Sequence, residues 1–113
     1  MFEGLRVYQA AELLDSIVLE LIAQIPRGFG KDIDQLKRAL GSAAYNIAEA
    51  TGSEQPGKKI NHLDIARGSV DEVRAILRRL ARGGALTHAQ IQRPCTLART
   101  IAKMLTSWIA TLM

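Results

Sequence analysis

Residues 63–80, LDIARGSVDEVRAILRRL, carry the most regular pattern in the chain. Their apolar side chains recur at steps of three, four, three, four and three residues, at Leu63, Ala66, Val70, Val73, Leu77 and Leu80. This spacing places apolar groups along one side of an α-helix, whereas a half-buried strand alternates with a period of two. Gly83 and Gly84 follow the pattern and predict the end of this helix.

Three further segments repeat the same spacing. They comprise Val7, Ala10, Leu14, Ile17 and Leu21; Ile33, Leu36, Leu40, Ala43, Ile47 and Ala50; and Ala98, Ile101, Leu105, Trp108 and Leu112. Four such helices of roughly 30 Å joined by short loops favour a bundle in which neighbours run antiparallel. We therefore predict an all-α fold, an antiparallel up-down-up-down four-helix bundle, with residues 1–113 as a single domain.

The ends of these helices have recognisable signals. Pro26 is expected to stop the first helix, and Asp32 is a suitable N-cap for the second. Thr87 and Gln90 have the spacing of a capping box, which predicts a start of the last helix near residue 88. Pro94 either kinks that helix or marks a second start.

Composition excludes several classes of protein. The chain has 113 residues, of which 48% are apolar and 4% aromatic, and its apolar runs are far shorter than the ~20 residues that cross a bilayer. The first residues lack the pattern of a signal peptide, so we expect a cytoplasmic protein without membrane contact. A single cysteine, Cys95, excludes an internal disulfide.

Small side chains gather in the middle of two helices, at residues 41–44 (GSAA) and at Ala66, Gly68 and Ser69. Glycine inside a helix costs about 1 kcal/mol relative to alanine, so a close approach of two backbones is the expected compensation. We predict that these two helices touch at this level.

More apolar side chains are present than one bundle core requires. Leu13, Val18 and Ile22 in the first helix, and Leu97, Met104 and Ile109 in the last, lie outside the stripes described above. An exposed apolar patch of this size marks an interface, which predicts a homo-oligomer. The alternative is a monomer with a wide buried face.

Signals for catalysis are sparse. His62 and His88 lack the neighbours that a metal site needs, and no phosphate-binding glycine loop follows a strand. Asp64, Arg67 and Asp71 have the spacing of surface ion pairs. Cys95, near Arg93, is either a reactive thiol or an inert small apolar group. We expect no enzymatic activity, no cofactor and no metal.

Polar residues interrupt the apolar stretch AYNIAEA, at Asn46 and Glu49. If they are partly buried, they need hydrogen-bonding partners, for which Arg38, Ser69 and Glu72 are candidates. Two interpretations stay open: a contact to a ligand or nucleic acid, and an interhelical polar network that fixes the register of the bundle.

Charge is distributed unevenly along the chain. The formal net charge is +4, and residues 73–113 contain seven basic side chains and no acidic one. The candidates for binding nucleic acid are Arg74, Arg78, Arg79, Arg82, Arg99 and Lys103. Spacings of four residues place several of them on shared helix faces, as expected for contacts to a phosphate backbone without sequence readout. Alternatively, these residues only maintain solubility and complement helix dipoles.

Three stretches resemble a known family: FEGLRVYQAAELL (2–14), DQLKRALGSAAYNIAEA (34–50) and HLDIARGSVDEV (62–73). They are similar to the bacterial 23S rRNA intervening-sequence proteins, also called the four-helix bundle protein family. The resemblance implies a four-helix protomer, a homopentamer and no established enzymatic activity. A related group, accessory proteins of diversity-generating retroelements, associates with nucleic acid and a reverse transcriptase through a basic surface. The expected partners are therefore further copies of the chain and RNA or DNA, or alternatively an unidentified protein.

Overall fold

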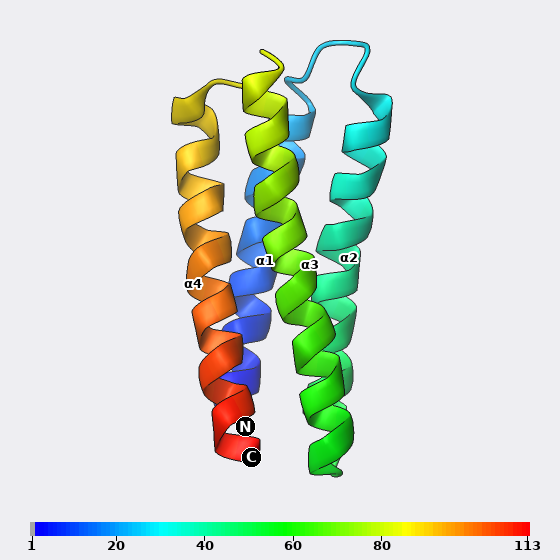
Figure 1. The fold of residues 1–113 in the computed structure, drawn as a ribbon, viewed down its shortest axis with the longest axis vertical. Helices are drawn as coiled ribbons and strands as arrows, with labels where there is room; N and C mark the ends of the chain where they lie inside the picture. Colours follow the sequence, from blue (N-terminus) through cyan, green and yellow to red (C-terminus); the bar gives the residue numbers. More distant parts are fainter. Residues whose placement is uncertain (1) are drawn as a thin grey trace.

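A computed structural model describes residues 2–113, which form four α-helices and no β-strand. The helices are α1 (Phe2–Ile22), α2 (Gly30–Gly52), α3 (Pro56–Arg82) and α4 (His88–Leu112). They run side by side with alternating direction, so that both ends of the chain lie at the same end of the bundle (Figure 1). The prediction of an all-α four-helix fold is confirmed. None of the described helices is long and apolar enough to cross a membrane.

Local sequence explains most of the helix ends. The capping box of α4 is confirmed: the Thr87 hydroxyl accepts from the Gln90 backbone N–H at 3.0 Å, and the Gln90 side chain accepts from the Thr87 N–H at 2.8 Å. Asp32 is not the N-cap of α2, because that helix begins at Gly30 with Phe29 before it. Asp32 lies in the first turn, where a carboxylate favours the helix dipole. Helix α4 continues through Pro94, so this residue does not mark a second start.

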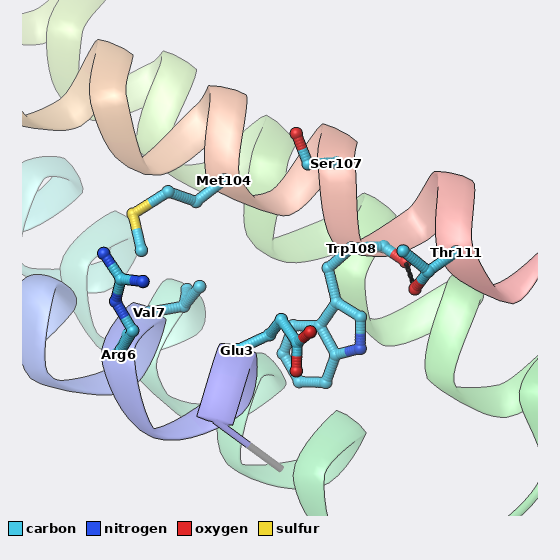
Figure 2. A pocket seen from close by; sticks show the side chains of 7 residues that line it. All are labelled: Glu3, Arg6, Val7, Met104, Ser107, Trp108 and Thr111. Atoms are coloured by element: carbon cyan, nitrogen blue, oxygen red, sulfur yellow. Dashed lines mark hydrogen bonds between the residues drawn. The ribbon is translucent and has the colours of Figure 1, made fainter.

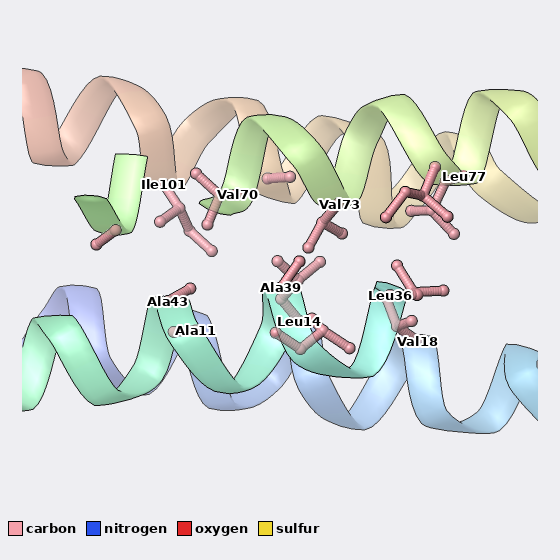
Figure 3. Packing of buried hydrophobic residues seen from close by; sticks show 14 of the residues in the cluster. Ala11, Leu14, Val18, Leu36, Ala39, Ala43, Val70, Val73, Leu77 and Ile101 are labelled. Atoms are coloured by element: carbon pink, nitrogen blue, oxygen red, sulfur yellow. The ribbon is translucent and has the colours of Figure 1, made fainter. Parts of the chain in front are cut away.

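The core is built by side chains of all four helices that point toward the bundle axis (Figure 3). All six apolar residues named in the segment 63–80 are buried. In α1, however, the buried stripe follows Val7, Ala11, Leu14, Val18 and Leu21, whereas Ala10 and Ile17 are only partly buried. Val18 and Ile109 are predicted to lie outside the core stripes, on an exposed apolar patch. Both belong to the core instead: Val18 is fully buried and Ile109 is 8% exposed.

Helices α2 and α3 touch where small residues were predicted to bring them together. The Ser69 hydroxyl donates to the Ser42 Oγ at 2.9 Å, and Ala43 and Ala66 are buried beside this contact. The role expected for the glycines is wrong, because Gly41 and Gly68 are exposed and a Cβ at either would meet nothing within 4 Å. Alanine and serine therefore permit the close approach.

The glycine that does allow a close approach is Gly4, at the end of the bundle that holds both chain termini. A Cβ built there would lie 2.9 Å from Thr51 Oγ1 of α2 and 3.1 Å from Trp108 Cη2 of α4. Helix α1 can therefore begin between α2 and α4 because residue 4 lacks a side chain.

Candidate nucleic-acid interface

One side of the bundle, between α3 and α4, collects positive charge. Helix α3 contributes Arg67, Arg74, Arg78 and Arg82, whose spacing of seven, four and four residues keeps them on one side of the helix. Helix α4 contributes Arg99 and Lys103. These six residues are called the cationic face below. The positive charges predicted from the sequence therefore come together from two helices, with the exception of Arg79.

A first hollow on this face lies near the loop that joins α3 to α4. Its volume is about 690 Å³, and Arg78 and Arg82 line it together with His88, Gln92 and Thr96 of α4. Arginine forks, an imidazole, an amide and a hydroxyl supply several hydrogen-bond donors within one concave surface. This combination of groups can hold a phosphate or another oxyanion.

A second hollow, of about 550 Å³, lies further along the same two helices. It is lined by Arg67, Asp71, Arg99, Lys103 and the hydroxyl residues Thr106 and Ser107. The Arg67 guanidinium donates to Asp64 Oδ1 at 2.6 Å and to Thr106 Oγ1 at 3.1 Å, so it also ties α3 to α4. The expected pair of Asp64 and Arg67 is confirmed, whereas Asp71 pairs with Arg74 instead of Arg67.

Arg74 lies between the two hollows and is the least exposed member of the face. Its side chain is 22% exposed, and its Nη1 is 3.8 Å from Asp71 Oδ1. Among the buried side-chain nitrogen and oxygen atoms of residues 3–113, only Arg74 Nε lacks a hydrogen-bond partner. The guanidinium of Arg74 is therefore held near the floor of the face rather than extended into solvent.

The half-buried thiol of Cys95 lines the first hollow together with Arg78. Burial raises the pKa of Cys95, and the positive charges of Arg78 and Arg74 oppose that change. The increase in pKa favours the inert thiol over the thiolate.

Arg79 does not belong to the cationic face. It follows Arg78 by one residue, which turns its side chain by about 100° around the helix, toward α2. There its Nε lies 3.4 Å from Asp32 Oδ1, across the seam between α2 and α3. The prediction that Arg79 belongs with the other basic residues is therefore wrong. Its acidic partner, Asp32, lies on α2, and the spacing within α3 gives no sign of that contact.

Arg67 is a member of the cationic face that the sequence does not predict, because its spacing suggests ion pairs with Asp64 and Asp71 alone. Its spacing of seven residues before Arg74 and eleven before Arg78 was the available signal. The ion pair of Arg67 with Asp64, three residues away, is a local interaction and is compatible with a place on the cationic face.

Asn46 of α2 belongs to an interhelical polar network, and of its three expected partners only Ser69 takes part. Asn46 is 7% exposed, and its amide donates to the Ser42 carbonyl at 2.8 Å. Its Oδ1 lies 2.9 Å from His62 Nδ1, so that nitrogen carries the proton and donates. Ser69 joins the network through its bond to Ser42.

The remaining residues expected in this network, Arg38, Glu49 and Glu72, are exposed. No hydrogen bond or ion pair among residues 2–113 connects their side chains to Asn46 or Ser69. The register between α2 and α3 instead places Ser42 and His62 next to Asn46, so these two residues supply its hydrogen bonds.

A separate hollow of about 330 Å³ lies at the end of the bundle with the chain termini, between α1 and α4 (Figure 2). Val7, Met104 and the Trp108 ring give it an apolar lining, and Glu3 and Arg6 border it. No group of three or more His, Cys, Asp or Glu side chains that could hold a metal ion occurs in the described part of the chain.

Taken together, these features define a four-helix bundle protein with a cationic face on α3 and α4. The model of the 23S rRNA-intervening sequence protein family matches residues 3–107. The chain therefore belongs to the 23S rRNA-intervening sequence protein family, as its resemblance indicated.

A solved structure supports the same assignment. The chain is similar to the crystal structure of a protein of unknown function from the S23 ribosomal protein family of Bacteroides thetaiotaomicron. The two share 25% sequence identity with a TM-score of 0.82, over 96% of this chain and 98% of the other. No curated protein is a match to this chain.

Proposed function

We propose that the protein binds RNA or DNA without sequence preference, through contacts from the cationic face to phosphates. The observation that carries the proposal is the convergence of Arg67, Arg74, Arg78 and Arg82 with Arg99 and Lys103 on one side of two adjacent helices. Phosphate contacts supply most of non-specific affinity for nucleic acids. The role is that of a binding protein rather than an enzyme.

The balance of charge on this face favours an anionic partner. Asp64 and Asp71 lie on the same side and pair with Arg67 and Arg74. Within residues 2–113, none of the ion pairs includes Arg78, Arg82, Arg99 or Lys103. These four cations are exposed and can contact phosphates without first breaking an ion pair.

A binding assay with matched charge variants tests the proposal. We expect Arg78→Gln combined with Arg82→Gln to weaken binding of a labelled mixed-sequence duplex by at least tenfold, measured by fluorescence polarisation at low salt. The control combines Arg38→Gln with Arg79→Gln, which also removes two positive charges, but from exposed positions outside the face. Equal weakening by both pairs would mean that only net charge matters and would contradict the proposal.

Salt dependence provides a second measurement on the same samples. The slope of log K against log salt is about −0.9 for each phosphate contacted on duplex DNA. We therefore expect the Arg78 and Arg82 double variant to reduce the magnitude of the slope by about 2, and the control to leave it unchanged. Binding that is absent even at low salt would overturn the proposed function.

A second candidate function, a scaffold that acts through self-association or a protein partner, rests on exposed leucines. Leu5, Leu13 and Leu19 of α1 are 55%, 45% and 44% exposed. Leu13 borders a hollow between α1 and α4 that also contains Leu97. The family resemblance implies a homopentamer, and a surface of this kind fits contact between copies.

Light scattering coupled to size exclusion tests self-association. We expect an oligomer for the unchanged protein, with a mass five times that of the chain for a pentamer. Leu13→Gln combined with Leu97→Gln should reduce the mass while helicity is retained, because these side chains lie outside the most deeply buried core. A monomer at all concentrations would contradict this candidate.

A further inference from the structure

The first hollow of the cationic face differs from the second in its charged groups. None of the described residues that line the first hollow is acidic, whereas Asp71 lines the second. Arg78 and Arg82 take part in no ion pair among the described residues, and the sequence has no acidic residue in 73–113. These two guanidinium groups are therefore available to an anion from outside the chain.

Hydrogen-bond donors reach this hollow from both helices. Arg78 and Arg82 are exposed and lie about 6 Å apart along α3, at a spacing of four residues. Across the hollow, α4 contributes His88, Gln92 and Thr96, which also follow one another at intervals of four residues. Because residues at this spacing lie on one side of a helix, an anion between α3 and α4 can receive hydrogen bonds from both.

The hollow has room for more than a phosphate group. Its volume of about 690 Å³ lies within the range of roughly 300–1,000 Å³ that is typical of sites for small molecules and cofactors. Buried Ile91 and half-buried Cys95 give part of its wall an apolar character. The space therefore admits a phosphate together with the sugar that carries it.

We infer that the first hollow is a binding site for a phosphate monoester at the end of a nucleic-acid strand. This inference rests on the proposed function and adds a preference for strand ends to it. A phosphate monoester carries a charge of about −1.5 to −2 at pH 7 and three strong acceptor oxygens. A phosphate within a strand carries a single negative charge and has one free oxygen fewer. Two arginines without acidic partners match the monoester better, because each can form a charge-assisted hydrogen bond to it.

The position of the hollow also favours a strand end. It lies between the last turns of α3 and the first turns of α4, at the end of the bundle opposite the chain termini (Figure 1). A phosphate within a strand has nucleotides on both sides, so the strand must bend for that phosphate to reach the floor of a concave site. A terminal phosphate has one neighbour and enters without that bend.

The experiment compares four forms of one mixed-sequence duplex, labelled at an internal position. Their ends carry 5′-phosphates, 3′-phosphates, 5′-methyl phosphates or hydroxyl groups alone. We expect a 5′- or 3′-phosphate to tighten binding about tenfold over hydroxyl ends in fluorescence polarisation at equal salt. The methyl phosphate, a diester with a single charge, should give a smaller gain. An equal gain from it would overturn the assignment to a monoester.

The failure of this inference is distinguishable from that of the proposed function. Equal binding of all four forms would overturn the inference while the proposed function stands. Absence of binding to every form would overturn both.

Matched variants test whether the gain arises in the first hollow. A terminal phosphate adds charge and strengthens binding to any cationic surface, so the readout is the ratio of affinities for the phosphorylated and the hydroxyl-ended duplex. Arg78→Gln combined with Arg82→Gln should bring this ratio close to one. Arg99→Gln combined with Lys103→Gln also removes two positive charges from the cationic face, but outside the first hollow, and should leave the ratio unchanged. An equal fall in the ratio for both pairs would overturn the inference.

A free nucleotide is another source of the same phosphate group. A nucleoside 5′-monophosphate is therefore added as a competitor to the 5′-phosphorylated and the hydroxyl-ended duplex. We expect it to displace the phosphorylated duplex down to the affinity of the hydroxyl-ended one and no further. A nucleotide that binds in calorimetry, while the duplex shows no preference for phosphorylated ends, would assign the hollow to free phosphate esters and overturn the inference.

Discussion

Small side chains line the seam between α2 and α3, whereas a large ring lies at the seam between α1 and α4. Helices α2 and α3 meet through Ala43, Ala66 and a hydrogen bond between two serines, and they pack extensively along their length. Helices α1 and α4 pack less extensively, and the large ring of Trp108 fills much of the space at their end. Side-chain volume, rather than the periodicity that both seams share, therefore sets how closely two helices approach.

Removing volume should be most costly at the seam of α1 and α4. We expect Trp108→Ala to lower the free energy of unfolding by about 3–5 kcal/mol, because it deletes the largest side chain of the core beside an existing hollow. Urea denaturation followed by far-UV circular dichroism measures this loss, since the variant has no tryptophan fluorescence. Trp108→Phe is the control and should lose less. Equal losses would show that ring volume is not what holds the two helices.

Adding volume should be most costly at the seam of α2 and α3. We expect Ala66→Leu to destabilise the protein by about 1–3 kcal/mol, because the position is fully buried and the added atoms force the two helices apart. The measurement is again urea denaturation. Ala75→Leu is a matched control on the exposed side of the same helix and should change stability little. If both variants were equally stable, the seam would not be tightly packed.

The polar network of the same seam should contribute a comparable amount to stability. We expect Asn46→Ala to cost about 1–3 kcal/mol, because it leaves the His62 Nδ1–H and the Ser42 carbonyl without their partner. Asn61→Ala, at an exposed position of α3, is the control and should be close to neutral. A loss at Asn46 no larger than at Asn61 would mean that solvent replaces the network.

The sequence predicts the core of α3 better than that of α1, for a physical reason. In α3 the six stripe positions between Leu63 and Leu80 lie among charged and polar residues, and all six are buried, whereas Ile65 outside the stripe is 44% exposed. In α1 most residues are apolar, so the sequence contains two adjacent apolar stripes and does not show which of them faces the core. Only packing against the other helices selects Val18 over Ile17.

The candidate site shows the same division between local and tertiary information. Spacing along one helix places Arg78 and Arg82 on a shared face, and both line the same hollow. The separation of Arg79 from them depends on Asp32, which belongs to α2. The bond of Asn46 to His62 likewise depends on the register between α2 and α3, which no local pattern specifies.

The glycines Gly41 and Gly68 sharpen the comparison further, because they lie beside the close seam without being part of it. We expect Gly41→Ala and Gly68→Ala each to stabilise the protein by about 0.5–1 kcal/mol, since the added methyl group meets nothing and the unfolded chain loses freedom. Thermal and urea denaturation measure the gain. The control is Gly84→Ala, where φ is +81° and a side chain is strained, so this variant should lose stability. Destabilisation by Gly41→Ala or Gly68→Ala would mean that another surface approaches these positions in solution. A gain at both would leave alanine and serine as the residues that bring α2 and α3 together.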